Sequence, residues 1–282
     1  MSKIIITTDC VCDLSEELIE MYDIKIIHFY VVTEHGWFKD LEEITSDNIV
    51  EYFERGGNQL LTKAPFREEY EAFFEKVLKE GDEILHVAVS SSVSLSCKNA
   101  TAAAERFGGR VQVIDSHQLS TGMAHLVLKA HQMVNRDKTA EEIKTELEAM
   151  RERVVTGFIA ENANYLYRAG HVGKFVKNMC ELLKIHPVLG MMYGNMRLKG
   201  VKIGNYENAV RRYVRKEMHR PAKIEKERVF ITHSGCNLKL VTAVKREVAR
   251  LGSFGEVLET EASATISSNC GANTIGVLFV RK

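Results

Sequence analysis

The stretch EILHVAVSSSVSLSCKNATAAAERFGG, residues 83–109, carries the pattern that decides the fold. Residues 83–89 are mostly aliphatic and have the length of a buried strand. A run of serines follows, and then an alanine-rich helix that Gly108-Gly109 closes. Residues 111–114 form the next aliphatic run. The order strand, serine loop, helix, strand predicts a βαβ unit of a mostly parallel sheet.

The same alternation covers the rest of the first half of the chain. Strands are predicted at residues 4–8 and 24–32, and Ser46 is predicted to cap a following helix. Polar residues come directly after three of the predicted strands: Asp9, the serines of residues 90–94, and Asp115-Ser116. Because ligands of such sheets bind beyond the carboxyl ends of the strands, we expect these residues to gather at one edge.

The second half of the chain begins near residue 155 and changes pattern. Tyr193-Gly194-Asn195 is a turn signal between two strand-like runs, which predicts a hairpin within residues 188–198. A helix is predicted at residues 238–251, and the last strands at residues 257–265 and 274–280. This half is therefore also expected to combine strands and helices.

Composition narrows the function classes. Lys+Arg and Asp+Glu both number 38 in 282 residues, so no global positive field favours nucleic acid or an anionic membrane. No apolar run reaches the length of a transmembrane helix, and no secretory leader is visible. We expect a cytoplasmic protein with reduced thiols, no nucleic-acid partner and no stable membrane insertion. Cys10 and Cys12 lack the second cysteine pair of a zinc site, so we expect no metal.

The serine run is the most informative candidate site. Hydroxyls at a strand-to-helix junction can bind an anion, whereas simple capping of the helix needs only one of them. A serine hydrolase built from Ser94, His233 and Asp115 is an alternative, although no Gly-x-Ser-x-Gly elbow supports it. A phosphoryl-transfer subunit is another, although no Walker loop occurs.

Taken in order, several segments resemble motifs of the DegV family of fatty-acid-binding proteins, found in bacteria. The resemblance spans nearly the whole chain, and it lies in the order and spacing of the motifs. The matching segments are Thr8-Asp9-Cys10-x-x-Asp13-Leu14, Thr62-Lys63-Ala64-Pro65-Phe66, the serine run, Asp115-Ser116 through Ser120-Thr121-Gly122, residues 166–172, and Ile185-His186-Pro187-Val188-Leu189.

The resemblance implies a two-domain α/β fold. Residues 1–155 would form a parallel-sheet domain with the serine-rich head-group site, and residues 156–282 a smaller domain with a mixed sheet that closes the lipid cleft. The implied ligand is a long-chain fatty acid, with its carboxylate held by Thr62 and Ser94. Asn269, Ser92 and Ser91 are second choices. The chain would be a carrier without a cofactor, not an enzyme, and would present the acid to a fatty acid kinase for phospholipid synthesis.

Three positions depart from the family pattern. Asn269 stands where the family has a histidine; an amide can donate a hydrogen bond but carries no charge. Leu95 replaces a glycine of the serine motif and adds bulk beside the head-group site. His171 replaces an arginine at a position suited to kinase docking. A divergent member that binds another amphiphile or a small anion is therefore the alternative.

Overall fold

The computed structural model describes residues 2–57, 60–168, 170 and 173–282. A parallel four-stranded sheet forms the first layer, in the order β2-β1-β6-β7. Its strands are β1 (Ile4–Asp9), β2 (Lys25–Ile27), β6 (Glu83–Ala88) and β7 (Val111–Asp115). The parallel sheet predicted from the alternation of strands and helices is confirmed.

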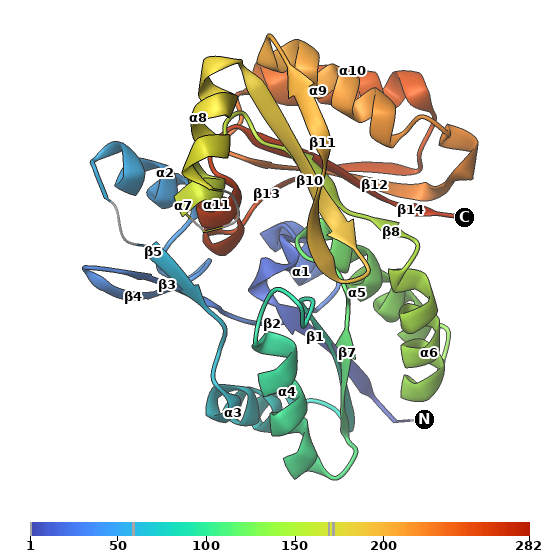
Figure 1. The fold of residues 1–282 in the computed structure, drawn as a ribbon. Coiled ribbons are helices and arrows are strands. Elements are labelled where there is room, and N and C mark those ends of the chain that lie inside the picture. Colours follow the sequence, from blue (N-terminus) through green and yellow to red (C-terminus); the bar gives the residue numbers. More distant parts are fainter. Residues whose placement is uncertain (1, 58–59, 169, 171–172) are drawn as a thin grey trace.

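Helices cover both faces of this sheet (Figure 1). On one face, α3 (Arg67–Val77) and α4 (Ser96–Ala104) pack Tyr70, Phe74 and alanines against Ile5 and Ile84. On the other face, α5 (Thr121–Val134) and α6 (Ala140–Arg151) pack against Ile6 and its neighbours. Short segments α1 (Glu16–Met21), η1 (Cys10–Cys12) and η2 (Glu105–Phe107) complete this layer.

A small antiparallel sheet, in the order β4-β3-β5, stands beside the first. It contains β3 (Tyr30–Thr33), β4 (Gly36–Lys39) and β5 (Leu60–Lys63), with α2 (Ser46–Glu54) between the last two. The single strand predicted over residues 24–32 is therefore wrong. The chain leaves the first sheet after Ile27, where the pairing of β2 with β1 ends. The Phe29 N–H donates to the Cys10 sulfur, and β3 joins the small sheet. Thr45, not Ser46, is the cap of α2.

The third sheet is mixed and has seven strands among the described residues, in the order β11-β10-β9-β14-β12-β13, with β8 paired to β14. Of the strand pairs described in this sheet, β12 with β13 is the parallel one, and the others are antiparallel. The strands are β8 (Val154–Val155), β9 (Gly157–Ile159), β10 (Ile185–Met192), β11 (Asn195–Ile203), β12 (Ile224–Ser234), β13 (Glu256–Glu261) and β14 (Thr274–Arg281). The hairpin predicted at Tyr193-Gly194 is confirmed between β10 and β11.

Two long amphipathic helices, α9 (Tyr206–Glu217) and α10 (Leu238–Leu251), cover the outer face of the mixed sheet. Three shorter ones, α7 (Asn164–Arg168), α8 (Lys174–Leu182) and α11 (Ala264–Cys270), lie toward the small sheet, and η3 (Pro221–Lys223) precedes β12. The strand predicted over residues 257–265 is wrong at its end. β13 stops at Glu261, and the Ser263 hydroxyl caps α11 by accepting from the Ile266 N–H.

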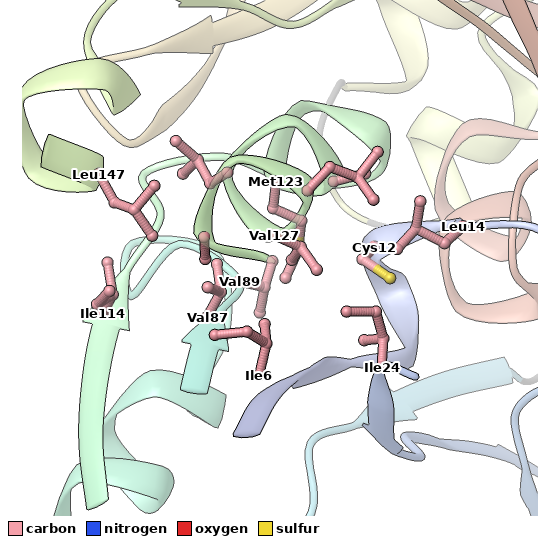
Figure 2. Close-up of a cluster of buried hydrophobic side chains, with 14 of the residues drawn as sticks. Ile6, Cys12, Leu14, Ile24, Val87, Val89, Ile114, Met123, Val127 and Leu147 are labelled. Atoms are coloured by element: carbon pink, nitrogen blue, oxygen red, sulfur yellow. The ribbon is translucent and has the colours of Figure 1, made fainter. Parts of the chain in front are cut away.

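Helix α5 lies between the two larger sheets and contacts both. Met123 and Val127 point toward Ile6 and Val87 of the parallel sheet (Figure 2). The opposite side of α5 meets the mixed sheet, where the Thr121 hydroxyl pairs with Thr232 at 2.5 Å. The two sheets therefore share one hydrophobic core around α5. No described helix has the length and apolar character needed to cross a membrane.

Candidate functional site

A cavity of about 880 Å³ lies where the parallel sheet, the small sheet and α11 meet. We call it the serine pocket. Its wall includes all five side chains that the sequence singled out for ligand binding: Thr62, Ser91, Ser92, Ser94 and Asn269. Thr62 comes from β5, the serines from the loop between β6 and α4, and Asn269 from α11. Residues separated by more than 200 positions in the chain thus share one pocket.

Asp9 holds the serine loop at both ends. Its buried carboxylate accepts from the Val89 N–H at 2.8 Å, before the loop, and from the Ser96 hydroxyl at 2.6 Å, after it. The Tyr70 hydroxyl donates to it at 2.6 Å. Burial alone would raise the Asp9 pKa, but the hydrogen bond and charge of His86, with Ser96 and Tyr70, lower it below its usual value. These contacts confirm that Asp9 and the serines gather at one edge of the sheet.

The hydroxyls of the loop differ in what they can still donate. The Ser91 hydroxyl and N–H both donate to the Asp115 carboxylate, so Ser91 has no proton left for an anion. Ser94 accepts from the Ser96 N–H at 3.2 Å, which leaves its own proton free. Within the described part of the chain, the Ser92 and Thr62 hydroxyls make no hydrogen bond. Ser94, Thr62 and Ser92 are therefore available donors, and the buried Thr265 hydroxyl, which also lines the pocket, has no partner among the described residues.

Asn269 is oriented differently from the sequence expectation. Its amide nitrogen donates to the Thr265 carbonyl at 2.8 Å and to the Ser268 hydroxyl at 3.3 Å. A carbonyl can only accept, so this contact fixes which end of the amide is the nitrogen. Both amide protons are used within α11, and the oxygen remains for the pocket. To donate to a bound carboxylate, Asn269 would have to give up one of these contacts, so its part in binding stays a prediction.

Two buried aspartates fix α11 against the first half of the chain. Asp13 accepts from the Ser263 N–H at 2.9 Å and from the Ser120 hydroxyl. Asp40 accepts from the Ala264 and Thr265 N–H groups at 2.9 and 2.8 Å. Burial raises the pKa of both carboxyl groups, that of Asp13 to about 7, against the effect of their hydrogen bonds. Sequence reasoning missed Asp40, because nothing in its local pattern points to a helix more than 200 residues away.

A second cavity, of about 60 Å³, adjoins the serine pocket. We call it the deep cavity. The two cavities share four wall residues: Leu119, Met196, Ile266 and Asn269. The deep cavity lies between α5, α11 and the inner face of the mixed sheet, and most of its surface is apolar. Together the two cavities place free hydroxyls at one end and an apolar space at the other.

The remaining sequence candidates form neither a catalytic triad nor a metal site among the described residues. Asp115 binds Ser91, and His233 Nε2 lies 3.3 Å from Glu259, so among the described residues no hydrogen bonds join Ser94, His233 and Asp115 into a triad. Leu95 lines the serine pocket with its side chain exposed. His171 lies outside the described residues. In the described part of the chain, no group of His, Cys, Asp or Glu side chains is arranged to hold a metal ion.

Comparisons with known proteins agree with this architecture. The model of the DegV family matches residues 3–282. DegV domain-containing proteins of Staphylococcus aureus (strain COL) and Deinococcus radiodurans are 25% and 26% identical, over 100% of both chains in the first case and 98% and 97% in the second.

Solved structures are similar over the whole chain. A fatty-acid-binding DegV family protein from Thermus thermophilus has 27% identity and a TM-score of 0.89, covering 99% of this chain and 100% of its own. The fatty acid binding protein DegV of Bacillus subtilis shares the fold, with a TM-score of 0.86 at 21% identity over 100% of each chain.

Proposed function

We propose that this chain, which belongs to the DegV family, binds a long-chain fatty acid as a carrier and not as an enzyme. The carboxylate would accept from the Thr62 and Ser94 hydroxyls in the serine pocket. The acyl tail would lie along the apolar side chains of that pocket, such as Leu119 and Ile266, and part of it would enter the deep cavity. Residues 1–155 would supply the head-group site, and residues 156–282 would close over the tail. The observation that carries the proposal is that free hydroxyls and an apolar cavity adjoin.

The physical chemistry of a fatty acid fits this division. Each buried methylene contributes about 0.8 kcal/mol, so the tail supplies most of the affinity. A carboxylate taken out of water needs charge-assisted hydrogen bonds, which Ser94 and Thr62 can donate and which Ser92 could supplement. Lys63 also lines the pocket and makes no ion pair within the described residues, so it adds positive charge nearby.

The same proposal includes a cytoplasmic location and delivery of the acid to a fatty acid kinase. Fatty acid binding, on which both depend, is supported by the Thermus thermophilus protein, which is described as binding fatty acid. All six cysteines are free thiols, which suits a reducing compartment.

Mass spectrometry of small molecules released from the freshly purified, denatured protein tests the proposal. We expect one long-chain fatty acid per chain, because a tail buried between two sheets leaves slowly. If the extract contains no stoichiometric ligand, titration of the protein with stearic acid shows whether it binds a fatty acid. A different stoichiometric ligand, or no saturable binding of stearic acid, would contradict the proposal.

Substitutions in the serine pocket test the head-group assignment. Ser94→Ala should weaken fatty acid binding about 10- to 100-fold, because a hydrogen bond to a charged group contributes roughly 1.5–3 kcal/mol. Ser91→Ala and Asn269→Ala should change the affinity by less than about threefold, because neither side chain has a free proton to donate. Calorimetric titration of the three folded variants measures this. Equal losses in all three would refute the assignment.

A further inference from the structure

Two hydroxyls in the wall of the deep cavity have no hydrogen-bond partner within the described residues. They are the side chains of Thr156, which is 2% exposed, and Ser234, which is 1% exposed. A buried hydroxyl without a partner costs about 1–3 kcal/mol, and proteins rarely keep one unless a ligand or a water molecule satisfies it. Two in one small cavity therefore need an explanation.

Both hydroxyls lie on the side of the mixed sheet that faces α5. Ser234 is two residues after Thr232 on β12, and alternate residues of a strand point to the same face. The Thr232 hydroxyl reaches Thr121 of α5, so Ser234 also points inward. Thr156 lies against Gly122 of α5, where a Cβ would come within 1.9 Å of its hydroxyl oxygen. The lack of a side chain at Gly122 leaves room for this hydroxyl.

The other hydroxyls of the cavity wall have protein partners. Thr232 bonds to Thr121 and Thr260, Ser120 to Asp13, and Thr274 to the Cys270 carbonyl. His233 also has an unpaired ring nitrogen, but it alternates with Ser234 on β12 and pairs with Glu259 on the outer side of the sheet. Of the hydroxyl-bearing side chains in the cavity wall, Thr156 and Ser234 are thus the two without a partner among the described residues.

We propose that the deep cavity binds an oxygen-bearing segment of the acyl chain, a hydroxyl or keto group, through Ser234 and Thr156. The inference rests on the proposed function and adds a class of ligand to it. A cavity of about 60 Å³ can hold a few water molecules when empty. A plain hydrocarbon tail would displace that water and leave both hydroxyls unpaired, whereas an oxygenated tail would replace the hydrogen bonds of the water.

The test compares stearic acid with 9-, 12- and 17-hydroxystearic acid by calorimetric titration of the whole protein. In the unmodified protein, at least one positional isomer should bind as tightly as stearic acid. Ser234→Ala and Thr156→Val should each weaken that isomer about tenfold relative to stearic acid in the same variant. Thr274→Val is the matched control, because it removes a hydroxyl of the same wall that is already bonded, and it should leave the ratio unchanged.

Three outcomes would overturn the inference. If stearic acid binds and every hydroxystearic acid binds more than tenfold more weakly, the two hydroxyls serve water only and the proposed function stands. If Ser234→Ala and Thr156→Val shift the ratio no more than Thr274→Val does, the hydroxyls do not contact the ligand. If none of the four acids binds, the proposed function fails and this inference fails with it.

Discussion

Replacing Asp9 with alanine should lower the free energy of unfolding by about 3–5 kcal/mol. The carboxylate is fully buried and accepts from the Tyr70 and Ser96 hydroxyls and from the Val89 N–H. Its removal leaves three buried donors with one partner fewer, and it takes the negative charge away from His86, whose Nε2 lies 3.4 Å from it. Urea unfolding followed by circular dichroism measures the loss.

Tyr70→Phe is the matched control for this substitution. It removes one of the donors and leaves the carboxylate in place, so we expect a loss of only about 1 kcal/mol. The lowered pKa of Asp9 also sets the direction in which stability changes with pH. Its contribution to stability is present above the unfolded pKa near 3.9 and is lost as the pH falls through the lower folded pKa. The difference in free energy of unfolding between the unsubstituted protein and Asp9→Ala should therefore shrink only in strong acid. An equal loss for both variants would contradict the assigned role.

The same substitution should also weaken fatty acid binding. Val89 and Ser96 stand at the two ends of the serine loop, and Asp9 is the group that fixes both. Without Asp9, Ser94 loses its defined position. The ligand must then order the serine loop as it binds, and the conformational entropy lost in that step lowers the affinity. The loss of affinity in folded Asp9→Ala should be comparable to that of Ser94→Ala.

Local patterns were enough to predict the parallel sheet and the serine loop. Aliphatic runs of strand length define β1, β6 and β7, and the rule that parallel strands end at one edge brings Asp9 to the serines. Motif resemblance was needed to bring Thr62 and Asn269 to the same pocket, because they lie on a small sheet and a short helix that have no strong local pattern.

The orientation of the side chains in the serine pocket could not be predicted from the sequence. Asn269 was expected to donate, yet the Thr265 carbonyl four residues earlier takes its amide proton. Ser91 is as polar as Ser94, but the contact with Asp115 from β7 uses its hydroxyl. Which hydrogen-bonding groups of a side chain stay free depends on tertiary partners, and composition and spacing carry no information about them.

Asp40→Asn and Asp13→Asn should have opposite effects, although both aspartates hold the start of α11. Both oxygens of Asp40 accept backbone N–H groups, from Ala264 and Thr265. An asparagine there must turn its NH₂ group toward one of them, which leaves that N–H unpaired. We expect a loss of about 2–4 kcal/mol in stability. Fatty acid affinity should fall too, since α11 carries Ile266 and Asn269 into both cavities.

Asp13 differs because one of its partners is a hydroxyl. An asparagine there can accept from the Ser263 N–H and donate to Ser120, whose oxygen is free to accept. The folded pKa of about 7 lies above the unfolded value near 3.9, so between these pH values the folded state holds a proton that the unfolded state has lost. Through this group, the free energy of unfolding of the unsubstituted protein therefore falls by up to about 1.4 kcal/mol per pH unit as the pH rises across that window. Asp13→Asn does not have this pH-dependent loss. In urea unfolding at pH 8 it should therefore be at least as stable as the unsubstituted protein. The difference in free energy of unfolding between the two should narrow toward pH 5. A loss at pH 8 as large as that of Asp40→Asn would show that the Asp13 charge itself stabilises α11.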